Sequence, residues 1–215
     1  VHLPEEVSFE KGAAMGHVGV AAWHAVVNHG DVEPGEICLI HGGGGGVGHI
    51  AVQIADAAGA TVITTEAKES TRDKLEEIGA DYTFDFRRDD LAEAITSVAN
   101  PDLIIDYHFD NYIEFDILNI AHGGRICVIE YSAEEGSEAT LPQQTLRAGL
   151  MKDVDIQLIG VYNANIGNVL KRLGKLAAQD DLKIEIAETY DLEDVAHAQE
   201  ELVNKTGLGS RVLIP

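Results

Sequence analysis

Residues Ile37 to Gly48 read ICLIHGGGGGVG, and the rest of the chain is organised around this stretch. Its first four residues are apolar, which is typical of a strand buried on both faces in a parallel sheet. Five glycines follow His41, so the strand ends in a tight turn. From Val47 to Ala58 the apolar residues recur at helical spacing without a proline, which predicts an amphipathic helix. We therefore expect a strand, a turn and a helix in immediate succession.

The glycines of this turn have the spacing of a ligand-binding fingerprint. Gly43, Gly45 and Gly48 fit the pattern G-x-G-x-x-G between strand and helix, which is the context that a dinucleotide site requires. The first glycine permits the turn, the second allows the backbone to approach a pyrophosphate, and the third allows helix and strand to pack. Unpaired N–H groups at the start of the helix then face the phosphate charge. A flexible linker is the alternative, but linkers normally have serine and other polar neighbours.

An acidic residue stands where such a site needs one. The strand expected over 60–65 is rich in β-branched residues and is followed by Glu66. Glu66 comes 18 residues after Gly48 and 23 after Gly43. An offset of about 20 is the one at which a carboxylate accepts hydrogen bonds from the adenosine ribose. The sequence has no G-K-[ST] motif, which disfavours a P-loop nucleoside triphosphatase.

The rest of the chain alternates strands and helices. We expect a pair of small-residue helices over 9–28, after an extended segment at 1–8. Strands are predicted at 37–41, 61–65, 82–84, 103–106, 125–130 and 154–161, and helices at 46–58, 69–78, 89–98 and 112–120. This alternation predicts right-handed βαβ units and an α/β fold with a doubly wound parallel sheet. After Asn163 the character changes, with a helix expected at 165–178, a strand at 183–189, a helix at 191–204 and a strand at 210–214.

The charge of the chain argues against two classes of partner. Among 215 residues, 15 Lys and Arg stand against 37 Asp and Glu, which gives a formal net charge of −22. Such a charge repels nucleic acid and anionic membrane surfaces, so we expect neither as a partner. The hydrophobic residues, 45% of the total, suffice to fill the core of one large domain.

The acidic residues are dispersed along the chain rather than gathered in a tail. With few lysines, this pattern resembles proteins of salt-accumulating archaea, and we expect a halophilic protein. Molar salt shortens the Debye length to about 3 Å and so screens the repulsion between acidic side chains. An acidic protein adapted to dilute salt is the alternative.

Other features of the sequence bear on compartment and processing. Cys38 and Cys127 lie inside predicted strands and have neither disulfide nor C-x-x-C spacing, so we interpret them as buried small hydrophobic residues. We find neither a signal peptide nor an apolar run of membrane-spanning length, which makes the cytoplasm the expected compartment. Because the sequence begins with Val1 rather than Met, we expect a fragment or a processed form.

These motifs together carry a family likeness. The succession LPEEVSFEKGAAM, AAWHAVV, EPGE, CLIHGGGGGVGHIAVQIADAAGATVITT, LEEIGAD, LIIDY, GGRICVIE and AHAQEELVNKTGLGSRVL resembles the medium-chain dehydrogenases/reductases. This superfamily includes zinc alcohol dehydrogenases and zinc-free quinone or enone reductases. The likeness covers essentially the whole chain, and GGVGHIAVQIADAAGA followed by LEEIGAD is its most specific part.

The resemblance implies a Rossmann fold with short remnants of a GroES-like catalytic domain at both ends. Residues 17–163 would form the dinucleotide-binding domain, 1–16 would be a remnant of the catalytic domain, and 164–215 would return to it. Family members carry the body of that catalytic domain before the point at which this sequence starts, so we expect it to be absent here.

The resemblance also implies roles for single residues at the cofactor. The pyrophosphate turn would consist of Gly43, Gly45, Gly46, Val47 and Gly48. Glu66 occupies the place of the acid that NAD-dependent members keep, whereas Lys68 could approach a 2′-phosphate. NAD(H) is therefore favoured over NADP(H), and both stay open as cofactors.

Further candidates follow the ends of strands, where ligands bind in open parallel sheets. Asp106 matches an acid near the cofactor in the family, although a polar stop to a buried strand explains it equally well. Glu130 to Ser132 and Tyr162 to Asn163 would border the nicotinamide.

His17 is the candidate metal ligand. It lies six residues before Trp23, where zinc-containing members place a cysteine, and histidine also binds zinc. Many zinc-free members have an apolar residue there, so the question of zinc stays open. Histidines such as His41 and His49 lack metal-ligand spacing with the others, and we interpret His197 as structural.

By resemblance, these features predict an oxidoreductase that moves a hydride between a nicotinamide cofactor and an alcohol, aldehyde or ketone. A zinc-free quinone or enone reductase is the second hypothesis, and a cofactor-binding module without activity of its own is the third. No residue is singled out as catalytic. Family members commonly pair through the last strand of the sheet, so we expect a homodimer joined near residues 154–161.

Overall fold

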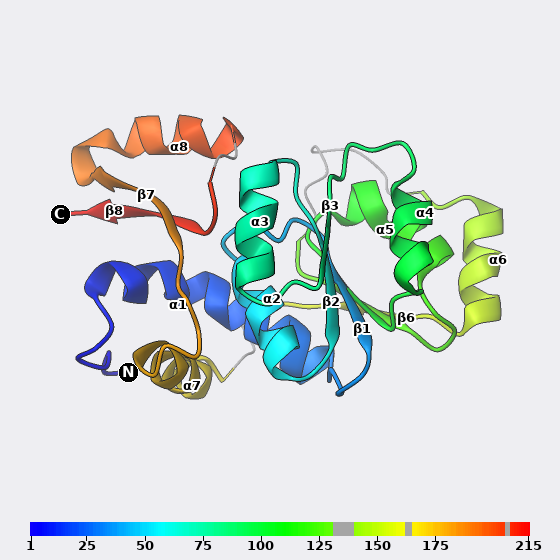
Figure 1. Ribbon diagram of the computed structural model, residues 1–215, viewed down its shortest axis with the longest axis horizontal. Coiled ribbons are helices and arrows are strands. Elements are labelled where there is room, and N and C mark those ends of the chain that lie inside the picture. The colour runs from blue at the N-terminus through cyan, green and yellow to red at the C-terminus, as the bar shows by residue number, and fades with distance from the viewer. Residues whose placement is uncertain (131–139, 162–164, 205–206) are drawn as a thin grey trace.

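The structure, a computed structural model, describes residues 1–130, 140–161, 165–204 and 207–215. Six strands form one sheet in the order β3-β2-β1-β4-β5-β6, and every pairing in it is parallel (Figure 1). The strands are β1 (Ile37–Ile40), β2 (Thr61–Thr65), β3 (Tyr82–Phe84), β4 (Leu103–Asp106), β5 (Arg125–Val128) and β6 (Asp155–Leu158). The direction of the strand order reverses between β1 and β4, and ligands bind in the crevice at such a point.

Helices cover both faces of this sheet, because alternate residues of its strands point to two separate cores. One core joins Cys38 and Ile105 of the sheet to α1 (Phe9–Trp23), α2 (Gly48–Ala57), α3 (Glu69–Glu77) and α7 (Ile166–Ala178). The other joins Leu39 and Ile104 to α4 (Leu91–Val98) and α5 (Phe109–Asn119), with α6 (Gln143–Lys152) packed beside them. The α/β fold with a doubly wound parallel sheet is therefore confirmed, and Cys38 and Cys127 are buried thiols as expected.

The amino-terminal region corrects one prediction. Instead of a helix pair over 9–28, α1 continues without a break into a single π-helical segment, η1 (His24–His29). The small residues of α1 serve close packing rather than a turn, since a Cβ on Gly19 would lie 2.8 Å from Leu173 of α7. The expected boundary after residue 16 falls inside this continuous helix.

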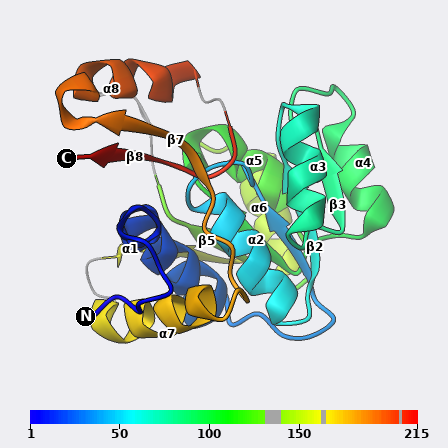
Figure 2. The ribbon, with the colours of Figure 1, turned by 60° about the vertical axis from the view of Figure 1, so that its left-hand side comes forward.

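The C-terminal residues form a second, smaller sheet that packs on the same core as α1, α2 and α7. After α7 come β7 (Ile186–Asp191), a 3-10 turn η3 (Leu192–Asp194), α8 (Val195–Asn204) and β8 (Ser210–Ile214). β7 and β8 pair in parallel as a two-stranded sheet of their own. Figure 2 shows this small sheet and α8 on the same side of the molecule as α1 and α7, away from α4.

Three further elements differ from the sequence predictions. β6 ends at Leu158 rather than at residue 161. β7 starts three residues later than predicted, because the backbone N–H and C=O of Lys183 bond to the side chain of Gln53 instead of to β8. The sequence did not reveal α6, in which Thr145 alone is buried, so its apolar residues follow no buried stripe.

Candidate cofactor site at the glycine turn

The glycine turn lies at the carboxyl end of β1 and is fixed to both neighbouring strands. The His41 N–H donates to the Ile105 carbonyl of β4 at 3.2 Å, and the Gly43 N–H donates to the Thr65 carbonyl of β2 at 3.1 Å. The Gly42 N–H donates to the Thr65 hydroxyl at 3.1 Å, and Gly42 itself has φ +64°. The turn is therefore held at the point where the strand order reverses.

Glycine is needed at the three positions of the fingerprint for different physical reasons. A Cβ on Gly43 would lie 2.2 Å from the Thr64 hydroxyl, and one on Gly48 would lie 2.3 Å from the Gly42 carbonyl, so the fold itself requires both. Within the described part of the chain, the nearest atom to a Cβ on Gly45 would be the Gly42 carbonyl at 3.4 Å. The fold leaves room for a side chain at Gly45, and close approach of a pyrophosphate gives a physical reason for a glycine there.

The start of α2 completes an anion-binding geometry. No side chain caps this helix, whose N-cap is Val47. The positive end of the helix dipole consequently lies at the glycine turn, although the His49 N–H of the first turn already donates to the Gly45 carbonyl at 3.1 Å. This combination of a glycine turn and an uncapped helix N-terminus fits a phosphate group.

Glu66 is half-buried directly after β2, and its carboxylate lies beside the turn. Oε1 accepts a hydrogen bond from the Lys68 N–H at 3.0 Å, and Oε2 would be 2.2 Å from a Cβ on Gly44. The side chain of Lys68 is exposed at the N-cap of α3. Glu66 is thus the nearer of the two residues to the glycines.

Two arginines that the sequence analysis missed lie at the same end of β2. Arg72 donates to the carbonyls of Glu66 and Ala67 at 2.9 Å, and Arg87 donates to the Ala67 carbonyl at 2.9 Å. Asp85 pairs with Arg87 at 2.6 Å, and this hydrogen-bonded pair lowers the pKa of Asp85 to about 2. Spacing in the sequence did not point to these contacts, because they join β2, α3 and the residues after β3.

Asp106 is fully buried at the end of β4. Its Oδ1 accepts the His108 N–H at 2.7 Å, whereas Oδ2 has no partner within the described residues. Burial, and secondarily the neighbouring carboxyl of Asp116, raises the pKa of Asp106 to about 6.

A buried pair next to the turn was also missed. His41 Nε2 lies 2.8 Å from Asp116 Oδ1 of α5, and both side chains are inaccessible to solvent. The His41 ring stacks on Tyr112 with 4.2 Å between centroids. Burial opposes a charge on His41, yet the attraction and hydrogen bond of Asp116 outweigh it and raise the pKa of His41.

The other sequence candidates lie apart or outside the described residues. Glu130 is exposed two residues after β5. Tyr162 and Asn163, like Ser132, lie outside the described residues. His17 is exposed on α1, and the described ranges contain no group of three or more His, Cys, Asp or Glu side chains placed to hold a metal.

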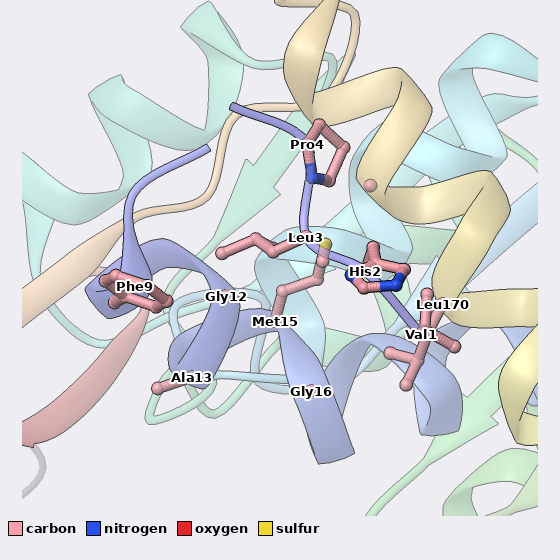
Figure 3. Close-up of a pocket in the computed structure, with 11 residues that line it drawn as sticks. Val1, His2, Leu3, Pro4, Phe9, Gly12, Ala13, Met15, Gly16 and Leu170 are labelled. Carbon is pink, nitrogen blue, oxygen red and sulfur yellow. The ribbon is translucent and has the colours of Figure 1, made fainter. Parts of the chain in front are cut away.

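An apolar cavity of about 270 Å³ lies elsewhere, where the first residues and α1 meet α7 (Figure 3). Leu3, Pro4, Met15 and Leu170 are among the side chains that line it. It has no charged wall and is separate from the glycine turn. Within the described part of the chain, no helix has the length and apolar character needed to cross a membrane.

Comparisons with known proteins agree with this geometry. A family model described as zinc-binding dehydrogenase matches residues 46–175. Quinone oxidoreductase from Homo sapiens is 28% identical over 218 residues, which cover 99% of this chain and 64% of that protein. The chain thus spans about two thirds of the length of the curated quinone oxidoreductases it matches, 64% in each of the first two.

Solved structures give the same picture. A quinone oxidoreductase from Pseudomonas syringae pv. Tomato superimposes with a TM-score of 0.86 at 28% identity, covering 100% of this chain and 67% of that one. An NAD-dependent alcohol dehydrogenase superimposes with a TM-score of 0.89 at 27% identity, covering 100% of this chain and 61% of that one.

Proposed function

Since this chain belongs to the zinc-binding dehydrogenase family, we propose that it binds the nicotinamide dinucleotide of an oxidoreductase that acts on alcohols or carbonyl compounds. The observation that carries the proposal is the open space at Gly45, between two glycines that the fold itself requires. Similarity to a quinone oxidoreductase and to an NAD-dependent alcohol dehydrogenase supports it. When bound, the nicotinamide supplies the acceptor or donor of the hydride.

In this proposal the residues of the turn bind and orient the pyrophosphate of the cofactor. Gly43 to Gly48 approach the pyrophosphate with backbone atoms, and the N-terminus of α2 offsets its negative charge. This local positive potential matters in a chain of net charge −22, which otherwise repels a dinucleotide. Asp106 borders the same crevice from the end of β4.

Glu66 favours NAD(H) over NADP(H) in this proposal. Its carboxylate beside Gly44 is placed to accept hydrogen bonds from the adenosine ribose hydroxyls. A 2′-phosphate there would bring a second negative charge against it. Lys68, Arg72 and Arg87 are cations near the same strand end and support NADP(H) as the second candidate.

The substrate is an alcohol, aldehyde or ketone, or in the second hypothesis a quinone or enone. The described residues provide His17 alone as a zinc ligand, which is too few for a zinc site, so no step is assigned to zinc. The third hypothesis, a cofactor-binding module without activity of its own, is supported by the lack of a complete acid–base set around the turn among the described residues.

Two statements about organisation belong to the same proposal. We assign residues 1–16 and 164–215 to the catalytic-domain side of the protein, and the separate β7–β8 sheet supports this for the C-terminal part. We also propose a homodimer through β6, the edge strand of the large sheet.

A cofactor titration tests the proposal. The purified chain in molar KCl is titrated with NADH and with NADPH, and binding is followed by cofactor fluorescence. We expect saturable binding that is tighter for NADH. Gly45→Ala should weaken it about tenfold or more, which corresponds to about 1.4 kcal/mol, because the new methyl group occupies the pyrophosphate approach.

Gly167→Ala is the matched control. Among the described residues its Cβ would meet Val1 alone, at 3.8 Å, so it makes the same chemical change away from the turn and should keep the affinity. Failure of both cofactors to bind, or equal binding by wild type and Gly45→Ala, would contradict the proposal.

A further inference from the structure

Two buried polar side chains of α2 face the C-terminal segment. His49 is fully buried and Gln53 is 7% exposed, and they lie one helical turn apart on the same face. Gln53 Nε2 donates to the Lys183 carbonyl at 2.9 Å, and its Oε1 accepts the Lys183 N–H at 2.7 Å. The backbone just before β7 is therefore bound to α2 by side chains.

The ring of His49 joins the glycine turn to the same backbone. Nδ1 lies 3.0 Å from the Gly45 carbonyl, and Nε2 lies 3.3 Å from the Glu185 N. A carbonyl accepts and an N–H donates, so Nδ1 carries the proton and Nε2 accepts. Burial lowers the pKa of His49, which agrees with this neutral ring.

The C-terminal segment also forms a direct hydrogen bond to the glycine turn, besides the one through His49. The Gly209 N–H donates to the Gly44 carbonyl at 3.0 Å, and the Ser210 N–H donates to the Glu185 carbonyl at 3.1 Å. Gly209 has φ +92°, and a Cβ there would lie 2.1 Å from the Glu185 carbonyl. Glu185 and residues 209–210 consequently form one unit that contacts two adjacent carbonyls of the turn, directly at Gly44 and through His49 at Gly45.

The hydrogen bond from His49 to the Gly45 carbonyl affects the direction of the next N–H group in the turn. In a trans peptide the C=O of one residue and the N–H of the next point in opposite directions. Holding the Gly45 carbonyl toward His49 therefore turns the Gly46 N–H the other way, toward the crevice at the start of α2. The Gly45 carbonyl also accepts the His49 backbone N–H at 3.1 Å, so the ring adds a second hydrogen bond to an orientation that the helix already sets.

We propose that His49 is a positioning residue that couples occupation of the glycine turn to the β7–β8 sheet. The inference rests on the proposed function, since it assumes that a nicotinamide dinucleotide binds at this turn. The ligand orders the Gly45–Gly46 peptide, which tightens the hydrogen bond between the Gly45 carbonyl and His49 Nδ1. Because the ring is rigid, the hydrogen bond between His49 Nε2 and the Glu185 N–H tightens with it. In the reverse direction, anchoring of Glu185 prepares the turn for its ligand.

Two conservative variants separate the two ends of this link. His49→Asn places an amide where Nδ1 stands, so it can still donate to Gly45 but does not reach Glu185. His49→Gln places an amide oxygen where Nε2 stands, so it can still accept from Glu185 but loses the Gly45 bond. Gln53→Met is the control that breaks the contact with Lys183 without touching the turn.

NADH affinity, thermal stability and hydrogen exchange at residues 183–191 are measured for all four proteins. We expect His49→Gln to weaken NADH binding about two- to fivefold, because the His49 backbone N–H still holds the Gly45 carbonyl. His49→Asn should weaken NADH binding by the same factor by which NADH protects the Glu185 amide in wild type, since coupling is reciprocal. Gln53→Met should stay within about twofold of wild type. NADH should slow exchange at the Glu185 amide in wild type, and this slowing should be lost in His49→Asn.

The outcomes are distinguishable. If affinity in the two His49 variants simply follows their thermal stability, or if the exchange effect survives in His49→Asn, the coupling is overturned and His49 is structural. If wild type binds no NADH, the proposed function is overturned, and the coupling with it.

Discussion

At the end of β4, the carboxyl group of Asp106 is held where its charge is disfavoured. Burial and the carboxyl of Asp116 raise its pKa to about 6, and only one of its oxygens has a partner among the described residues. The folded state therefore binds this proton more tightly than the unfolded chain, whose aspartates titrate near pH 4. The contribution of Asp106 to the free energy of unfolding is favourable below about pH 4, and it is lost as the pH rises through about 6.

Asp106→Asn should remove this dependence. The amide oxygen keeps the bond from the His108 N–H, and the side chain can no longer ionise. We expect the variant to gain about 2–3 kcal/mol relative to wild type between pH 4 and pH 7, since each pKa unit corresponds to about 1.4 kcal/mol. Denaturant unfolding at a series of pH values measures the difference.

Asp89→Asn makes the same charge change at an exposed position and serves as the control. Parallel stability curves for wild type and Asp106→Asn would show that Asp106 ionises normally in the folded protein.

Single residues differ in how well their structural role could be predicted from the sequence. Gly48 could be interpreted because the atoms that a Cβ there would meet belong to Gly42 and Gly43 of the same motif, and Gly43 because its place in the G-x-G-x-x-G pattern is a local signal, although the atom it would meet is on Thr64. His41 could not, since its partner Asp116 is 75 residues away and buried charge pairs leave no local pattern. The same holds for His49, whose second partner is 136 residues away.

Among the elements, β1 was predicted well because burial imposes a plain apolar pattern on it, whereas α2 was placed correctly but was expected to be amphipathic. Every residue of α2 from Gly48 to Ala55 is buried, and β1 has three buried residues in four. The predicted helix pair over 9–28 was wrong, because glycines that allow two helices to touch look the same in sequence as glycines that end one. α6 was missed because its apolar side chains point outward.

Those outward side chains support an interface at the β6 edge. Leu150 and Met151 of α6 are 84% and 74% exposed, and Leu158 of β6 is 75% exposed. An edge strand that carries exposed apolar side chains is normally covered. A second copy that adds its own β6 would extend the sheet across the contact.

We expect a dimer in molar KCl and a shift to monomer in Leu158→Lys, because the added charge would be buried without a partner. Light scattering coupled to size-exclusion chromatography measures the mass. Leu192→Lys introduces the same change at a leucine of η3 that is 54% exposed, and it should stay dimeric. A monomeric wild-type protein would refute the interface.

For the whole molecule, alternation of strands and helices was sufficient to predict the fold class, and the six-stranded parallel sheet confirms it. The parallel pairing of β7 and β8 lay beyond that reasoning. The contacts that place these two strands run to α1 and α2, which are distant in sequence.

The net charge of −22 leads to a prediction at the same scale. Dispersed carboxylates repel one another in dilute buffer, and molar salt screens them because the Debye length falls to about 3 Å. We expect the midpoint of thermal unfolding to rise by several degrees between 0.1 M and 2 M KCl, as measured by circular dichroism. A midpoint that is equal or higher in dilute buffer would refute the halophilic hypothesis.

The bond between Gly44 and Gly209 also bears on the order in which the protein assembles. These residues are 165 positions apart, so a ribosome that has made the strand, the glycine turn and α2 has not yet made the donor to the Gly44 carbonyl. Contacts of such long sequence separation form late, because closing a long loop costs entropy that only further contacts offset. The bond from Gly209 to the turn is therefore expected among the last contacts to form, after the bonds that join the turn to Thr65 and Ile105.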